Sequence, residues 1–270
     1  MDPDKQAVHD FWNEEACGEG RALTGLSADD YRQHSRWRYA NEPFILDFAR
    51  FGDYAGKKVL EIGVGLGSDH QRFAEAGASL WGMDLTERAI EHTRRRLALE
   101  GLHSDLRVAD AENLPFDDNF FDMVYSWGVL HHTPNTAKAV DEVYRVLRPG
   151  GDARIMLYHK YGIVGLCLWT RCGLLRLKPF TSLDEIYARY MESPGTQAFT
   201  ADQARRMFSR FADVQVRILL GCGDLMAEHV GQRHQGRLLR IAKRIWPRGL
   251  VSRYLTHYGS VMTICAKKPS

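Results

Sequence analysis

From Lys57 onward the sequence alternates short apolar runs with charged, amphipathic segments of helical length. The runs at 57–64, 79–84, 105–110, 120–127 and 152–159 predict strands, and the segments at 69–76, 86–99 and 135–147 predict helices between them. Parallel strands need crossovers of this length, usually helices, so the alternation predicts a parallel sheet with helices on both faces. Two further strands, at 213–220 and 260–266, complete an expected seven-stranded α/β sheet of the Rossmann-like type.

Two regions decorate this core. Residues 1–56 combine helical patterns with bulky aromatic side chains and predict an N-terminal helical cap or lid, whereas 57–270 form the Rossmann-like domain. Insertions on the substrate side are expected at about 160–199, after the fifth strand, and at about 224–257. Thr200 is expected to cap the helix that follows the first insertion.

The formal net charge is only +2, but the basic residues are unevenly distributed. No Asp or Glu follows Glu228, whereas nine Lys or Arg do. Such a stretch fits a solvated helix face, or an anionic partner such as a membrane surface, a phosphorylated substrate or RNA. A basic tail alone does not favour nucleic acid as a partner, since no further RNA-binding module accompanies it.

The cysteines and the N-terminal residues bear on the compartment. Five cysteines without a C-x-x-C pair predict neither a disulfide framework nor a zinc site, and no metal is expected. The acidic N-terminus does not resemble a secretory signal. The longest uncharged apolar stretch, Tyr161 to Thr170, is well below the roughly 20 residues that span a bilayer. We therefore expect a cytoplasmic protein.

A glycine-rich turn follows the first predicted strand. Gly63, Gly65 and Gly67 alternate with other residues, which allows a tight turn and a close approach of the backbone to a ligand. The spacing differs from the dinucleotide fingerprint because Ser68 stands where a third glycine would be expected. Glu61, at the end of the buried strand, needs a partner for its charge, and a cationic cofactor could provide one.

Asp84 ends the second predicted strand. A carboxylate at that strand tip can accept hydrogen bonds from both hydroxyls of a ribose. Asp84 could instead only support the start of the helix that Thr86 is expected to cap. The glycine turn upstream favours the ribose interpretation.

Three further motifs follow in order: ADAENLPF at 109–116, VLHH at 129–132 and LRPGG at 147–151. With these, the stretch from about Lys57 to Leu157 resembles the class I S-adenosylmethionine-dependent methyltransferases. It is most similar to the small-molecule group that includes the ubiquinone and menaquinone C-methyltransferases. This resemblance implies a seven-stranded sheet whose last strand is antiparallel, a role that suits 260–266.

The resemblance also implies which residues bind S-adenosylmethionine. Gly63, Gly65 and Gly67 would line its methionine and ribose, Asp84 with the neighbouring Leu85 would hold the ribose, and Asp110 would bind the adenine amino group. Ala111 would lie beside the adenine ring, and Ser126 to Gly128 would pass under the sulfonium. Asp110 could alternatively be only a turn former.

Three histidines follow strands at the carboxyl edge of the sheet, where ligands bind in open α/β folds. An imidazole at His131 or His132 could take a proton from an acceptor hydroxyl during methyl transfer. The same pair could equally close a loop through backbone hydrogen bonds. His159, after the fifth strand, is a further candidate on the same edge.

The acceptor is expected to contact the N-terminal cap, where Trp12, Tyr31 and Trp37 could exclude water and attract a sulfonium cation. Ordinary packing explains each of them as well. The apolar stretch 161–177 could line a lipophilic acceptor pocket or lie against a membrane. An amphipathic helix at about 237–246, ended by Pro247, could likewise make peripheral contact with a membrane, or it could only cover the core.

The sequence thus predicts an enzyme that transfers a methyl group from S-adenosylmethionine to a small, lipophilic or anionic metabolite, at oxygen. Transfer to carbon or nitrogen is the alternative within the same fold. From other classes, a nicotinamide-dependent oxidoreductase and a non-catalytic cofactor-binding module remain open. The identity of the acceptor and the oligomeric state do not follow from the sequence.

Overall fold

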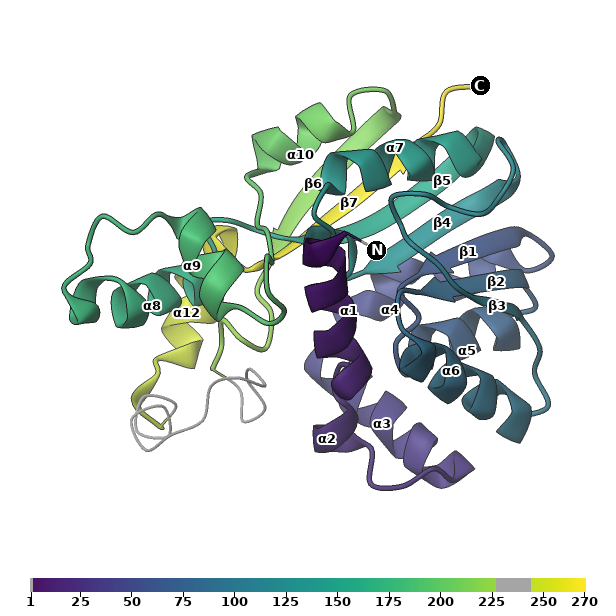
Figure 1. Cartoon of the computed structure of the whole chain (residues 1–270), viewed down its shortest axis with the longest axis horizontal. Coiled ribbons are helices and arrows are strands. Elements are labelled where there is room, and N and C mark those ends of the chain that lie inside the picture. The colour runs from purple at the N-terminus through teal and green to yellow at the C-terminus, as the bar shows by residue number, and fades with distance from the viewer. Residues whose placement is uncertain (1, 227–243) are drawn as a thin grey trace.

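The computed structural model describes residues 2–226 and 244–270, and its centre is one seven-stranded sheet (Figure 1). The strands lie in the order β3-β2-β1-β4-β5-β7-β6. The first five pair in parallel, and β7 runs antiparallel to both β5 and β6. The strands are β1 Lys58–Ile62, β2 Ser79–Asp84, β3 Asp105–Val108, β4 Phe121–Trp127, β5 Leu147–Tyr158, β6 Ala212–Leu219 and β7 Val261–Lys267. The predicted Rossmann-like sheet and its antiparallel last strand are confirmed.

Helices cover both faces of the sheet, because alternate side chains of the strands feed two separate apolar clusters. One cluster joins Val124 and Ile155 to the helices α7 Thr136–Val146 and α10 Ala201–Met207. The other joins Met123 and Tyr125 to the helices α4 Phe44–Ala49 and α5 Ser68–Glu75. The helix α6 Glu87–Leu99 packs along β2 and β3. Because successive side chains of one strand point to opposite faces of the sheet, each strand contributes to the apolar clusters on both faces.

The predicted helix caps are confirmed, and one strand start differs. The side chains of Thr86, Asn135 and Thr200 each accept a hydrogen bond from the first turn of the helix that follows. The fifth strand was expected over 152–159, but β5 already begins at Leu147, so it includes the LRPGG motif. The pairing of β5 with β4 shifts register after Leu147, so the motif is accommodated as an irregularity within the strand.

The N-terminal residues form the helices α1 Pro3–Glu14, α2 Glu19–Ala22 and α3 Ala28–Asn41, followed by α4 and the short η1 Phe51–Tyr54. A buried arginine of α6, Arg96, fastens α3 to the glycine turn. Its guanidinium donates to the carbonyls of Tyr31 and Leu66 at 2.7 and 2.8 Å and to the hydroxyls of Ser35 and Ser68. The division at residue 56 into a cap and a main domain stays a prediction.

The insertion after β5 forms a separate lobe that projects from the sheet (Figure 1). It contains α8 Ile163–Cys172, η3 Leu174–Arg176 and α9 Leu183–Tyr190, and α12 Arg248–Tyr254 lies in the same lobe, followed by η4 Thr256–Tyr258. Buried Asp224 attaches the lobe to the sheet by accepting hydrogen bonds from the backbone of Val164, Gly221 and Ser260.

Most of the amphipathic helix predicted at about 237–246 lies outside the described residues. Among the described residues, no helix has the length and apolar character needed to cross a bilayer.

Candidate cofactor and acceptor site

A cavity of about 350 Å³ lies at the carboxyl edge of the sheet, beside the neighbouring strands β1 and β4. From β1 the chain continues to β2 on one side, and from β4 it continues to β5 on the other, so the crevice lies at the topological switch point. The cavity wall includes every residue that was expected to bind the cofactor except Ser126: Glu61, Gly63, Gly65, Gly67, Asp84, Leu85, Asp110 and Ala111.

The glycine turn is shaped by what surrounds each glycine. All three have positive φ, 81° at Gly63, 51° at Gly65 and 75° at Gly67. A Cβ on Gly63 would lie 2.8 Å from the Cβ of Val129, and one on Gly67 would lie 2.8 Å from the hydroxyl of Thr93. A Cβ on Gly65 would meet no heavy atom within 4 Å. Gly63 and Gly67 therefore pack against the fold, whereas Gly65 borders open space.

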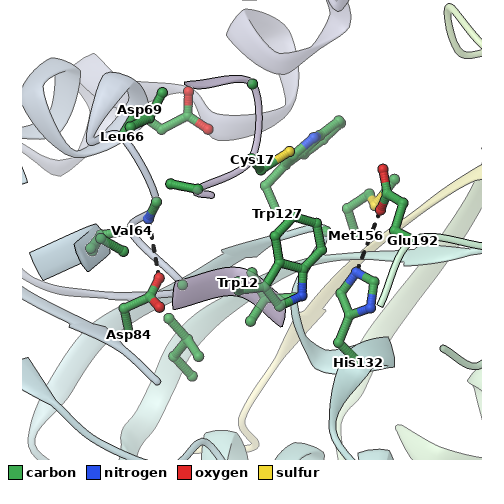
Figure 2. A pocket seen from close by; sticks show the side chains of 18 of the residues that line it. Trp12, Cys17, Val64, Leu66, Asp69, Asp84, Trp127, His132, Met156 and Glu192 are labelled. Carbon is green, nitrogen blue, oxygen red and sulfur yellow. Dashed lines mark hydrogen bonds and ion pairs between the residues drawn. The ribbon is translucent and has the colours of Figure 1, made fainter. Parts of the chain in front are cut away.

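Asp84 combines the two roles that the sequence left open. Its carboxylate accepts hydrogen bonds from the Thr86 backbone and hydroxyl at 3.0 and 2.9 Å, and from the backbone N–H of Gly65 at 3.2 Å (Figure 2). The side chain thus supports the start of α6 and also lines the cavity. Burial raises the pKa of this carboxyl, although the backbone donors partly oppose that effect.

Asp110 is contacted by the first helix of the chain. Lys5 in α1 donates to the Asp110 carboxylate at 2.6 Å and lies 2.8 Å from the Glu112 carboxylate. The other Asp110 oxygen accepts a hydrogen bond from the backbone of Glu112 at 2.9 Å, as a turn former would. Lys5 also lines the cavity, so α1 closes the Asp110 end of it.

The two histidines of the VLHH motif have different surroundings. Both are buried, but only His132 lines the cavity. His132 Nδ1 lies 2.8 Å from Ser193 Oγ and 3.1 Å from Thr196 Oγ1, while its Nε2 lies 3.6 Å from Glu192 (Figure 2). Burial lowers the pKa of His132 to about 3. His131 stacks against Tyr158 with ring centroids 3.9 Å apart, and neither of its nitrogens has a hydrogen-bond partner.

Of the other residues that the sequence predicted for the site, some line the cavity and others do not. Trp12 and Trp37 line the cavity. Tyr31 does not: its hydroxyl pairs with His92 at 2.9 Å. His159 and Ser126 also lie outside the wall, because His159 Nδ1 bonds to the Gly259 carbonyl and the Ser126 hydroxyl donates to the Ile62 carbonyl.

Residues 60–155 match a protein family described as a methyltransferase domain. This stretch is a class I S-adenosylmethionine-dependent methyltransferase domain. Over 122 residues the chain is 37% identical to phosphoethanolamine N-methyltransferase 2 of Caenorhabditis elegans. The matched residues are 42% of this chain and 27% of that protein. Over 101 residues it is 42% identical to phthiotriol/phenolphthiotriol dimycocerosates methyltransferase of Mycobacterium tuberculosis, which covers 37% of each. The chain thus spans well under half the length of these relatives.

Solved structures extend the likeness in fold to nearly the whole chain. Magnesium protoporphyrin IX methyltransferase of Synechocystis matches with a TM-score of 0.56 at 12% identity, over 99% of this chain and 98% of that one. The [4+2]-cyclase SpnF matches with a TM-score of 0.55 at 17% identity, over 88% of this chain and 82% of that one. At these identities the likeness establishes the fold alone.

The methyltransferase domain buries Glu61 in a pair that the sequence did not reveal. One carboxyl oxygen lies 2.9 Å from His70 Nδ1, and His70 Nε2 lies 2.8 Å from the Ser104 hydroxyl. Ser104 donates its own proton to the Leu80 carbonyl, so it accepts from His70 Nε2–H. A neutral His70 then leaves Nδ1 as an acceptor, which requires a protonated Glu61. Burial raises the pKa of Glu61 and lowers that of His70 to about 3, in agreement with this proton arrangement.

A second buried carboxylate, Asp69, follows the glycine turn and lines the cavity of the methyltransferase domain. Arg38 holds it through two bonds of 3.0 and 2.6 Å, and the hydroxyls of Tyr39 and Tyr125 donate to it at 2.9 and 2.8 Å. Burial alone would raise the pKa of Asp69, but Arg38 and these hydroxyls outweigh burial and lower it. Sequence analysis missed this cluster because its members come from α3, α5 and β4. The signal was an acid two residues after the last glycine of the turn.

The far end of the cavity contains Trp127, from the stretch expected under the sulfonium, and several residues that carried no motif signal. These are the two carboxylates of Glu42 and Glu192, together with Tyr158 and Met156. In Figure 2, Trp12 and Trp127 stand between Asp84 on one side and the His132–Glu192 pair on the other. The cavity of the methyltransferase domain therefore has a glycine-turn half and an aromatic, acidic half.

The glycine-turn half fits the nucleoside and methionine portions of S-adenosylmethionine. Gly65 leaves open space where any side chain would intrude, and Asp84 presents a buried carboxylate to the same space. Asp110 and Ala111 line the wall farther along, at the end where Lys5 contacts Asp110. Each of these residues belongs to the set that the resemblance implied.

Proposed function

We propose that this chain transfers a methyl group from S-adenosylmethionine to a hydroxyl oxygen of a small, lipophilic acceptor. The observation that carries the choice of oxygen is the position of His132, whose ring lines the cavity opposite the glycine-turn half and whose buried Nε2 lies 3.6 Å from Glu192. S-adenosylmethionine supplies a methyl group bonded to a positively charged sulfur.

The residues of the glycine-turn half hold and orient the cofactor. Asp84 accepts the ribose hydroxyls, the backbone around Gly65 approaches the methionine portion, and Asp110 with Ala111 contacts the adenine. Lys5 neutralises Asp110 and must share that carboxylate with the adenine amino group. Glu61 would be the carboxyl nearest the ammonium group of a bound cofactor; a cation beside it would lower the pKa of Glu61 and favour release of its proton to solvent.

The hydrogen bonds around His132 support its role as the base. Thr196 donates its hydroxyl proton to the Ser193 carbonyl at 2.7 Å, so its oxygen can only accept from His132 Nδ1. With the proton on Nδ1, the buried Nε2 has a lone pair and no hydrogen-bond partner among the described residues. Neutral His132 therefore has an unused acceptor nitrogen in a ring that lines the cavity, where we place the substrate hydroxyl.

A histidine with a lowered pKa is adequate for this task. An oxygen that forms a third bond becomes far more acidic than a free alcohol, so a weak base removes its proton as the new carbon–oxygen bond forms. The carboxylate of Glu192, 3.6 Å from Nε2, then stabilises the imidazolium, and Tyr158 holds Glu192 through a hydrogen bond of 2.7 Å. Catalysis rests otherwise on positioning in a cavity whose walls exclude water.

The lipophilic character of the acceptor is supported by the wall of the aromatic, acidic half. Indoles from Trp12, Trp37 and Trp127 and apolar side chains from Leu168 and Met191 line it. The names of two curated relatives agree with such an acceptor: one includes phosphoethanolamine, a lipid headgroup, and the other includes dimycocerosates, which are lipid-like. An apolar wall with a few convergent polar groups is typical of small-molecule sites.

Transfer to an amine nitrogen is the second candidate, and the two carboxylates favour it. Burial raises the pKa of Glu42, which lines the cavity as Glu192 does, and the nearby negative charge of Glu192 acts in the same direction. An acceptor with an ammonium group would compensate both charges and rest against the indole faces. The relative named as an N-methyltransferase agrees with this candidate.

One labelling experiment tests the proposal. Cell extract fractionated by polarity is incubated with the chain and methyl-labelled S-adenosylmethionine, and labelled products are identified. We expect label in the apolar fractions, lost with Asp84→Ala. His132→Asn should lower kcat by roughly 10²- to 10⁴-fold for an oxygen acceptor while leaving the Kd of S-adenosylhomocysteine unchanged. Near-normal turnover by that variant would make the histidine structural, and labelled amines would establish the second candidate. Binding of NAD in calorimetry, without S-adenosylhomocysteine binding, would replace both with an oxidoreductase.

A further inference from the structure

The outer end of the insertion lobe exposes three large apolar side chains that lie close together in the sequence, and two of them are more exposed than any other large apolar side chain among the described residues. Residues 174–180, here termed the apolar tip, connect α8 to α9. Leu175 is 74% exposed, Leu177 91% and Phe180 98%. Scattered apolar residues on a surface are ordinary, but large ones this exposed and this close in sequence indicate an interaction site.

The apolar tip is a closed loop that holds these side chains outward. Its backbone is bonded across the turn, from Lys178 N–H to the Gly173 carbonyl at 2.9 Å and from Leu177 N–H to the Leu174 carbonyl at 3.0 Å. The indole of Trp169 donates to the Thr181 carbonyl at 3.0 Å, which fastens the return of the loop to α8. The exposure of the tip is thus a consequence of a hydrogen-bonded turn.

The charged side chains within the apolar tip and in the stretch 161–183 around it are all basic; the first acids after it are Asp184 and Glu185 in α9. Arg176 and Lys178 lie within it, Arg171 precedes it in α8, and no Asp or Glu occurs between Lys160 and Leu183. In the same lobe, α12 exposes Leu250 and Tyr254, and the chain from 244 to the end also lacks acids. Apolar side chains interleaved with Lys and Arg match the acyl and anionic headgroup layers of a membrane surface.

The inner side of the same lobe forms part of the cavity. Val164 and Leu168 of α8, together with Met191 after α9, line its aromatic, acidic half. One short helix therefore has the cavity wall on one side and leads into the apolar tip at its end. A molecule that leaves the acyl layer beside the tip would reach the acceptor half along apolar side chains.

We propose that this chain docks on an anionic lipid bilayer through the apolar tip, and that the acceptor reaches the cavity from that bilayer. The second part rests on the proposed lipophilic acceptor, whereas the docking surface does not. The docking is peripheral: the side chains of the tip enter the interface, and Arg176 and Lys178 contact lipid phosphates.

Vesicle co-sedimentation of the full chain tests the docking. Vesicles of equal parts phosphatidylcholine and phosphatidylglycerol are compared with vesicles of phosphatidylcholine alone. We expect binding to the anionic vesicles, weakened by salt as electrostatic attraction is screened. The triple variant Leu175→Ser/Leu177→Ser/Phe180→Ser should bind about tenfold or more weakly. Arg176→Glu/Lys178→Glu should lose binding while keeping the apolar side chains.

The matched control is Leu26→Ser/Leu99→Ser/Val108→Ser, which removes three apolar side chains that are 43–46% exposed outside the lobe and should bind vesicles like the unmodified chain. Calorimetry with S-adenosylhomocysteine on every variant separates loss of docking from loss of the proposed cofactor site. Equal sedimentation of the tip variant and the control overturns the proposal. So does an unmodified chain that ignores anionic vesicles but forms a dimer that the tip variant abolishes, because a second copy then covers the tip.

Discussion

The glycine turn predicts opposite outcomes for the same substitution at two positions. Gly63 and Gly65 both have positive φ, 81° and 51°. An alanine at either position costs roughly 1–2 kcal/mol for the left-handed backbone conformation. What distinguishes the two is the space around the added methyl group.

At Gly63 the methyl group has no room. It would lie 2.8 Å from both the Cβ and the Cγ1 of Val129 and only 2.1 Å from the Cγ2 of that valine. Overpacking of this kind adds roughly 1–3 kcal/mol, so Gly63→Ala should lower the free energy of unfolding by about 2–5 kcal/mol. That is a large part of the roughly 5–15 kcal/mol by which a domain is stable.

At Gly65 the methyl group enters open space in the cavity wall. Gly65→Ala should therefore destabilise the fold by only about 1–2 kcal/mol. Its methyl group occupies volume that the cofactor needs, so the Kd of S-adenosylhomocysteine should rise about tenfold or more, equivalent to about 1.4 kcal/mol.

Urea denaturation and titration calorimetry measure the two effects separately. Adding Val129→Ala to Gly63→Ala should recover part of the lost stability, because it removes both clashing methyl groups of the valine. Equal destabilisation by the two alanines would refute the packing argument. Unchanged affinity in Gly65→Ala would show that the cofactor does not approach this glycine.

Two further predictions concern stability. Arg96→Met should lower the free energy of unfolding by roughly 2–4 kcal/mol, because it leaves buried carbonyls without donors. Arg95→Met, at an exposed neighbouring position, should change the free energy of unfolding by less than about 1 kcal/mol. Similar denaturation midpoints for the two variants would contradict the role given to Arg96. Burial lowers the pKa values of His34, His70 and His132 to about 3, below the 6.5 of an unfolded chain. The unfolded state therefore takes up protons first, and stability should fall as the pH drops from about 6.5 towards 3, by roughly 1.4 kcal/mol per pH unit for each histidine. The buried carboxyls Glu42, Glu61 and Asp84, whose pKa values are raised, act in the opposite direction, so the contribution of each histidine is measured as the difference in pH dependence between the unmodified chain and its His→Gln variant. Equal pH dependence of the chain and all three variants between pH 7 and pH 5 would show that these rings are already charged or solvated in the folded protein.

Much of the fold followed from local pattern. Strand and helix periodicity, the cap at Thr86 and the glycines at 63, 65 and 67 depend on near neighbours in the chain, so the sequence alone was sufficient to place them. The predicted start of the fifth strand at 152 was wrong. β5 begins at Leu147, because a register shift against β4 accommodates the LRPGG motif within the strand.

The sequence could not assign partners to buried charges. Glu61 was expected to need a cation as its partner, yet it is protonated and hydrogen-bonds to neutral His70 of the next helix. The cluster of Arg38, Asp69 and Tyr125 brings together three segments that no local pattern connects. Such pairs depend on side-chain directions across the packed layers, which periodicity does not specify.

The sequence by itself determined the order of the strands along the chain, the glycine turn and the acids at the strand tips, because these follow from backbone conformation and repeat spacing. Only the tertiary structure decided that His132 rather than His131 lines the cavity, and that an apolar loop at the end of the insertion lobe is left exposed. Adjacent residues in a short turn point in different directions, and which direction leads to the cavity depends on elements folded from far away in the chain.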